Sequence, residues 1–240
     1  MAAENAHGVD PTDFREIIEE YAREDAMREE LIKKSREVIK LSKQAIFALH
    51  RRDTPEAQSH LQMAQKVFNE NIWPITEEHP ALRLAGAAGG GVLVPAGMLT
   101  GAVEEYAEAR IFLHFLLHKS LLTRKEIKEI KEIRVEEYLG GLMDCTGELN
   151  RFAVLRATEG HRAAVQECAA FVAAVHEQML LLDLRNLPLR RKYDALKYSQ
   201  KRLEALVYEL ALASRIAGLK LASMLVEPEP ETHAEQARDA

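Results

Sequence analysis

Residues 30–50 read ELIKKSREVIKLSKQAIFALH. Apolar side chains recur in this stretch every three or four residues, with lysine, arginine and other polar side chains between them. The apolar positions are Ile32, Val38, Ile39, Leu41, Ile46, Phe47 and Leu49. This spacing is typical of an α-helix that buries a broad face and exposes the opposite one. The stretch therefore predicts an amphipathic helix.

The same periodicity extends over most of the chain and predicts an all-α fold. Asp13 is expected to cap a helix that starts at Phe14. Further helices are expected over 30–50, 56–71, 98–120, 135–159, 162–184 and 189–225. No run of alternating β-branched residues is long enough to form a sheet. We therefore expect a single-domain bundle of about seven helices.

Three kinds of sequence signal separate these helices. Asp53-Thr54-Pro55 and Asn186-Leu187-Pro188 are turn signals, and Gly160 is expected to end a helix. Thr123 and Glu126 form a capping box that predicts a short charged helix up to Arg134. The glycine-rich stretch 74–97 predicts a loop, since no Gly-Lys-Ser/Thr follows it as a phosphate-binding loop would require.

The composition limits the class of protein. The 240 residues are 47% hydrophobic and 29% charged, which is typical of a soluble globular chain. Two cysteines form no disulfide framework, and no secretory signal precedes them, so we expect a reducing compartment. That compartment is taken to be the cytoplasm, with the nucleus as a second location. Residues 84–103 approach membrane-spanning length, but their glycines and acidic flanks favour a chain without a membrane partner.

Charge is distributed unevenly along the chain. Residues 1–30 hold ten acidic and three basic residues, whereas 31–220 hold 28 basic and 23 acidic ones. We therefore expect a flexible acidic N-terminus over 1–12, a helical domain over 13–226 and a disordered acidic tail over 227–240. The mildly basic body allows a surface that faces nucleic acid, although solvated helix faces explain the same pattern.

Two groups of carboxylates stand in otherwise apolar helices. Glu105 and Glu108 are three residues apart on one helix, and Asp144 and Glu148 are four apart on another, so each pair shares a face. Acids among apolar neighbours are unfavourable unless they are paired or bind a cation. Hard oxygen ligands of this kind suit Mg²⁺ or Mn²⁺ and a phosphodiester substrate.

Other interpretations of the charged and histidine pairs are left open. Salt bridges would also satisfy the acids, for example Asp144 with Arg151, or Glu108 with Arg110 of a neighbouring molecule. His114 and His118 have the spacing of a zinc pair, but Phe115 stands where a zinc protease has glutamate and no third ligand is evident.

Four sequence blocks occur in a recognisable order. They are SREVIKLSKQAIFALHR (35–51), EYAEA (105–109) followed by HF (114–115) and SL (120–121), YLGGLMDCTGELNR (138–151), and NLPLRRKYDALKY (186–198). Together they resemble the translin family, and in particular its translin-associated factor X branch. The stretch 73–99 looks longer than the family's usual connection, and the block at 190–194 is as similar to translin as to factor X.

The resemblance implies a seven-helix fold that assembles into hollow, roughly octameric shells. In the factor X branch, two glutamates and one aspartate hold the catalytic metal, and these correspond to Glu105, Glu108 and Asp144, with Glu148 as an additional ligand. The resemblance thus implies a Mg²⁺-dependent endoribonuclease, with Mn²⁺ as the alternative metal, that cleaves single-stranded RNA. The alternative is a non-catalytic translin-like subunit that binds single-stranded RNA or DNA.

The expected partners follow from the same two alternatives. They are single-stranded RNA, short single-stranded DNA, and either a translin-like subunit in a hetero-oligomer or further copies of this chain in a homo-oligomer. Basic side chains would supply phosphate contacts that do not depend on base sequence. The candidates are Arg51, Arg52, Lys119, Arg190, Arg191, Lys192 and Lys197.

Overall fold

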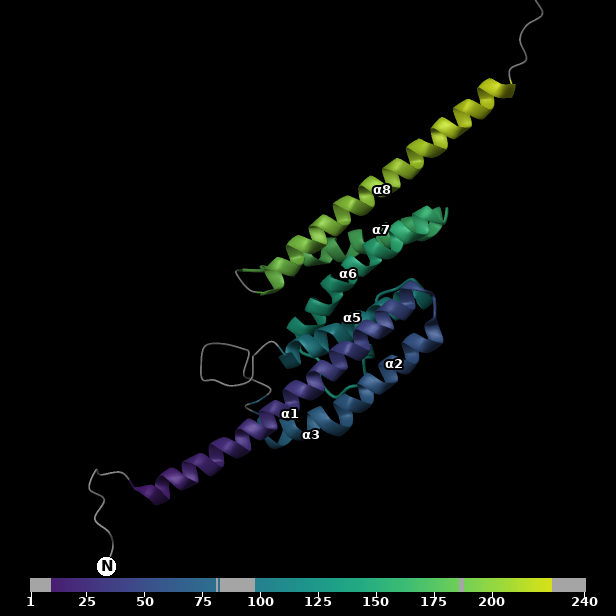
Figure 1. Ribbon diagram of the computed structural model, residues 1–240. Coiled ribbons are helices and arrows are strands. Elements are labelled where there is room, and N and C mark those ends of the chain that lie inside the picture. Colours follow the sequence, from purple (N-terminus) through teal and green to yellow (C-terminus); the bar gives the residue numbers. More distant parts are fainter. Residues whose placement is uncertain (1–9, 81, 83–97, 186–187, 226–240) are drawn as a thin grey trace, which may run out of the picture.

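The computed structural model describes residues 10–80, 82, 98–185 and 188–225, which form helices and connecting turns with no strand among them (Figure 1). The helical segments are α1 (Pro11–His50), α2 (Thr54–Val67), the π-helical turn η1 (Phe68–Ile72), α3 (Trp73–Glu78), α5 (Met98–His118), the 3₁₀ turn η2 (Arg124–Glu126), α6 (Val135–Thr158), α7 (Arg162–Met179) and α8 (Pro188–Leu225). The predicted all-α class is confirmed. None of the described helices is both long and apolar enough to cross a membrane. The stretch 83–97 lies outside the described residues.

Helix α1 is a single helix of 40 residues that starts earlier than predicted. Asp10, rather than Asp13, is its N-cap, and the Asp10 side chain accepts a hydrogen bond of 2.8 Å from the backbone N–H of Thr12. Pro11 occupies the first helical position, where its missing N–H loses no helical hydrogen bond. Asp13 therefore lies in the first turn, where its charge still interacts favourably with the helix dipole.

Three other helix ends also differ from the sequence prediction. The helix predicted over 56–71 does not end before Trp73, because η1 and α3 continue it to Glu78 and Pro74 is tolerated in the first turn of α3. The Thr123–Glu126 capping box forms, but it opens only the 3₁₀ turn η2 and no helix reaches Arg134. Helix α7 ends at Met179 rather than at 184. The leucines directly after Met179, Leu180 to Leu182, are exposed.

The direction of the packed helices explains how distant residues meet. Lys43 of α1 contacts Glu105 of α5, and further along the same two helices the rings of His50 and Phe112 lie 5.2 Å apart. Helix α6 follows the same direction, since Gly141 lies against Glu104 near the start of α5, and the rings of Phe112 and Phe152 further along both helices are 5.9 Å apart. Helices α1, α5 and α6 therefore run in parallel, and α8 packs against α6 and α7 (Figure 1).

Two glycines allow α5 and α6 to approach each other closely. A Cβ atom on Gly141 would lie 2.6 Å from the backbone oxygen of Glu104 and 2.9 Å from the backbone nitrogen of Glu108. At Gly140 it would collide with the Glu104 carboxylate, a flexible group that can move aside. The backbone atoms facing Gly141 cannot move in this way, so a larger residue at Gly141 would push the helices apart. The glycines thus bring the acidic residues of both helices together.

Helices α1 and α8 extend beyond the bundle at opposite ends (Figure 1). The protruding part of α1 exposes four large apolar residues, namely Phe14, Ile17, Ile18 and Tyr21. Their spacing of three and four residues places them on one face of the helix. The far part of α8 exposes Tyr208, Leu212 and Ile216 in the same manner.

Candidate active site

A cavity of about 510 Å³ opens between α1, α5, α6 and α8. It is lined by Lys43, Ile46 and Phe47 of α1, Glu105 and Glu108 of α5, Met143, Asp144, Gly147, Glu148 and Arg151 of α6, and Ala195 and Ser199 of α8. All four acids that the sequence singled out therefore face one cavity. The three- and four-residue spacings align the acids on each helix, and the glycine contact between α5 and α6 joins the two pairs.

Glu108 is the most deeply buried of these acids, with 6% of its surface exposed. Burial raises the pKa of its carboxyl to about 9, and the negative charges of Asp144, Glu105 and Glu148 add to the shift. No hydrogen bond or ion pair reaches the Glu108 carboxyl from the described part of the chain. An added cation would therefore reduce the repulsion between Glu108 and the neighbouring carboxylates.

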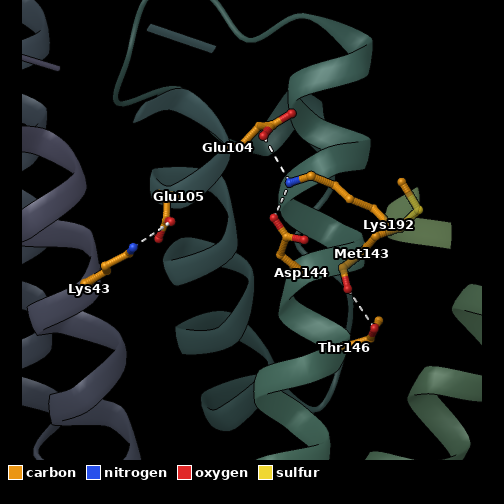
Figure 2. Close-up of polar contacts among 7 residues, drawn as sticks. All are labelled: Lys43, Glu104, Glu105, Met143, Asp144, Thr146 and Lys192. Carbon is orange, nitrogen blue, oxygen red and sulfur yellow. Dashed lines mark hydrogen bonds and ion pairs between the residues drawn. The ribbon is translucent and has the colours of Figure 1, made fainter. Parts of the chain in front are cut away.

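The other three acids are each paired with a basic side chain. Figure 2 shows the Lys43 ammonium group facing Glu105, at 3.3 Å, and Lys192 in contact with Asp144. Burial raises the pKa of Glu105, and Lys43 partly offsets that shift.

Glu148 pairs with a histidine and an arginine. Its Oε2 atom lies 2.5 Å from Nε2 of His50 and 3.8 Å from Arg151. Arg151, which was expected to pair with Asp144 if salt bridges satisfy the acids, forms its ion pair with Glu148 instead. Likewise, Arg110 pairs with Glu129 of the same chain.

Lys192 has a different position from the one expected of a phosphate-binding residue. Its Nζ atom lies between two carboxylates, 3.0 Å from Glu104 and in direct contact with Asp144 (Figure 2). Burial alone would lower its pKa, but the hydrogen bonds and charges of Asp144 and Glu104 outweigh burial and raise it. Lys192 therefore contacts the acidic cavity through Asp144 and links α8 to both α5 and α6.

The remaining basic candidates do not gather at one place. Their ion-pair partners are Glu56 for Arg51, Glu159 for Arg52, Glu167 for Lys119, and Asp194 for both Arg190 and Lys197. Arg191 is exposed and has no ion pair among the described residues. Lys119 follows the last turn of α5, whereas Lys192 contacts Glu104 near its start, about 20 Å away at 1.5 Å per residue. Exposed ion pairs are weak, so these side chains remain free to exchange partners.

Three residues at the cavity were not among the sequence candidates. Lys43 and His50 pair with two of the acids, and Phe47 lines the wall between them. The three lie at positions i, i+4 and i+7 of α1, so they share one face. Their spacing along one face of α1 was the signal that sequence reasoning could have used.

The described residues contain no preformed metal-binding geometry. Within the described ranges, no three His, Cys, Asp or Glu side chains are grouped so that they could hold a metal ion. This applies to the acidic cavity in its ion-paired arrangement and to His114 and His118. The His114 Nε2 atom lies 3.1 Å from the Ser120 hydroxyl, and its ring centre is 4.6 Å from that of His118.

Fold and site together define an all-helical protein with a carboxylate-lined cavity enclosed by four helices. The Translin family model matches residues 26–214, and the chain belongs to the Translin family. The resemblance inferred from the sequence blocks is therefore confirmed.

Individual relatives agree with this assignment. Over 200 residues, the chain is 25% identical to the translin-associated protein X homolog of Schizosaccharomyces pombe. This match covers 77% of this chain and 81% of the relative. The chain is 32% identical over 111 residues to Gallus gallus translin, and this match covers 42% of this chain and 48% of that translin. The second match thus spans about half of the relative.

A solved structure supports the fold. AfC3PO in complex with duplex RNA superposes with a TM-score of 0.67 at 20% identity, covering 84% of this chain and 97% of that one. At this level of identity the similarity concerns the fold.

Proposed function

We propose that this protein is a metal-dependent endoribonuclease of the translin and factor X type, which cleaves single-stranded RNA within an oligomeric shell. The observation that carries the proposal is the Glu108 carboxyl. It is buried in an open cavity among three further acids, and no cation of the described chain pairs with it. Such a group neither stabilises the fold nor forms a salt bridge, so its position is suited to binding a ligand from solution.

The residues fit a divalent metal in their chemistry. Glu105, Glu108 and Asp144 would hold Mg²⁺ or Mn²⁺, and Glu148 would add a fourth carboxylate. When bound, such a metal polarises a phosphate and lowers the pKa of a bound water. Lys43 and Lys192 are the counter-charges of Glu105 and Asp144 in the metal-free protein, and a bound metal would take that role.

RNA as the substrate has two sources of support. A relative in fold, AfC3PO, was solved in complex with duplex RNA. The helical body of the chain is mildly basic, and exposed Arg191 together with the exchangeable ion pairs of Arg190 and Lys197 would contact phosphates. We propose single-stranded RNA and short single-stranded DNA because the cavity opens between helices that a flexible strand can enter.

Assembly follows from the protruding helices. The apolar face of α1 from Phe14 to Tyr21 and the exposed apolar residues of α8 from Tyr208 to Ile216 need partners. A translin-like subunit or further copies of this chain would cover them. The family relationship supports the same conclusion.

The second candidate function is a non-catalytic RNA-binding subunit. One observation favours it: Lys43 and Lys192 already neutralise two of the four acids, His50 contacts a third, and the described residues hold no preformed metal site. In that case the acids serve only to hold α1, α5, α6 and α8 together.

Cleavage of a fluorescently labelled single-stranded RNA distinguishes the two functions. We expect the wild type to cleave in Mg²⁺ and to stop in excess chelator, and we expect Glu108→Gln to bind RNA without cleaving it. Glu70→Gln is a control, because Glu70 is exposed and Lys66 is its single ion-pair partner among the described residues. A wild type that binds RNA yet leaves it intact in Mg²⁺ and Mn²⁺ would establish the binding subunit instead. Cleavage that continues in chelator would exclude the carboxylate mechanism.

A further inference from the structure

Phe47 is an exposed aromatic residue at the wall of the acidic cavity. The sequence places it in the apolar stripe of α1, yet 51% of its surface is exposed, whereas Ile46, Ala48 and Leu49 beside it are buried. An exposed aromatic ring that lines a cavity is available to stack against a ligand that enters it. Phe47 differs in this respect from its buried neighbours in the stripe.

Arg151 of α6 lies over this ring. Its guanidinium carbon is 5.4 Å from the centre of the Phe47 ring, and its side chain is 56% exposed. The ion pair of Arg151 with Glu148 is long, at 3.8 Å, so the guanidinium group is only loosely held by that carboxylate. The ring and the cation thus form a pair in which both partners remain accessible.

The surroundings of this pair leave room for a flat molecule with a negative charge. Gly147, Ala195 and Ser199 line the cavity with little side-chain volume, and the total space of about 510 Å³ is in the range of ligand pockets. Lys43 lies one helical turn before Phe47 and supplies a second cation. A flat aromatic surface flanked by two cations matches a nucleotide, whose base stacks and whose phosphate pairs with the cations.

We propose that Phe47 and Arg151 form a base-stacking subsite that holds the nucleotide adjacent to the phosphate at the carboxylates. This inference rests on the proposed action on single-stranded RNA and adds how the strand is positioned. Because every base has a π face, the subsite accepts any base and selects for an unpaired one. A duplex, in which the bases are stacked on each other, would not supply a free base to Phe47.

The test uses binding in chelator, so that cleavage plays no part. The probe is a short single-stranded RNA with one 2-aminopurine, whose fluorescence falls when the base stacks. We expect the full-length wild type to quench this fluorescence and Phe47→Trp to preserve the quenching. Phe47→Leu keeps an apolar side chain but removes the ring, and we expect it to lose the quenching and to weaken affinity by roughly tenfold.

Two controls separate stacking from other effects. Met63→Leu changes an exposed apolar residue of α2, which does not line the cavity, and should leave quenching and affinity unchanged. A strand that lacks the base at the probe position should bind the wild type about tenfold more weakly than the intact strand does. Phe47→Leu should bind both strands with the same weak affinity.

Several outcomes would overturn the subsite. The first is full quenching by Phe47→Leu, and the second is equal affinity of the wild type for the strands with and without the base. The third is an altered oligomeric mass of Phe47→Leu, which would mean that a second copy covers the ring. Failure of the proposed nuclease looks different, because stacking would then be present while cleavage in Mg²⁺ is absent.

Discussion

Lys192 of α8 donates a hydrogen bond to the carboxylate of Asp144 of α6, although the two residues are 48 positions apart in the chain. The same ammonium group reaches Glu104 of α5 at 3.0 Å. One side chain therefore joins three helices at the cavity and neutralises an acid that the proposed metal would need. Lys192 thus links the helices, and it would compete with the proposed metal for Asp144.

Replacing Lys192 by Met should weaken the metal-free fold. The change leaves Asp144 and Glu104 without a counter-charge in a half-buried place, and we expect the free energy of unfolding to fall by about 1–2 kcal/mol. This is less than for a fully buried pair, because the Lys192 side chain is 23% exposed. Urea unfolding in chelator measures the effect, and adding Mg²⁺ should restore part of the loss. Lys66→Met, at an exposed pair, should change the stability by less than about 0.5 kcal/mol.

Replacing Glu108 by Gln should stabilise the metal-free protein at alkaline pH. The pKa of Glu108 is raised from 4.5 to about 9, mainly by burial. The folded protein therefore keeps a proton that the unfolded chain releases between these values, so the wild type loses stability as the pH rises through this window. Gln removes that penalty, and we expect a gain of about 2–4 kcal/mol at about pH 8 that disappears below about pH 4.5.

Melting curves in chelator at several pH values measure this effect. A melting temperature of Glu108→Gln below that of the wild type at about pH 8 would mean that the carboxylate has a cationic partner, which is the salt-bridge alternative. Glu70→Gln should show no such pH dependence, since Glu70 is exposed.

The helices and the acids were predictable from sequence because both depend on local spacing. Glu105 and Glu108 share a face whatever the tertiary structure, and so do Asp144 and Glu148. The partners of these acids could not be predicted, because Lys192 meets Asp144 only through the packing of α8 on α6. The prediction of helix ends failed where the structure overrides a local signal. Pro74, for example, lies in the first turn of a helical segment and does not end one.

The irregular segment after η2 shows a second limit of local patterns. Ile127, Ile130 and Ile133 are spaced by three residues, which fits a helix, and all three are buried. The chain nevertheless is not helical between η2 and α6. Burial of the isoleucines in the core stabilises this path, so tertiary contacts override the helical pattern.

Replacing Gly141 by Ala should separate the two acidic helices. The added methyl group would meet the backbone of Glu104 at 2.6 Å, and backbone atoms cannot move aside as a flexible side chain can. We expect a loss of about 1–3 kcal/mol in urea unfolding and loss of RNA cleavage, since the distance between the acid pairs would increase. Gly147→Ala is the matched control on the same helix, because its Cβ atom would have no neighbour within 4 Å. That variant should gain up to about 1 kcal/mol from helix propensity, and equal effects of the two changes would contradict the close-packing argument.

Replacing Ile18 by Lys should disrupt assembly. Ile18 is 63% exposed at the centre of the apolar face that Phe14, Ile17 and Tyr21 complete, on the part of α1 that protrudes from the bundle (Figure 1). A charge at the centre of a buried apolar interface is strongly unfavourable, whereas the same charge on a solvated helix has little effect. We therefore expect Ile18→Lys to have a smaller mass than the wild type by light scattering, while its circular dichroism remains helical. Glu19→Lys introduces the same side chain one position away, outside the apolar face, and should assemble normally. Assembly of Ile18→Lys to the wild-type mass would show that this face of α1 is not an interface, and the exposed residues of α8 would then be the next to test.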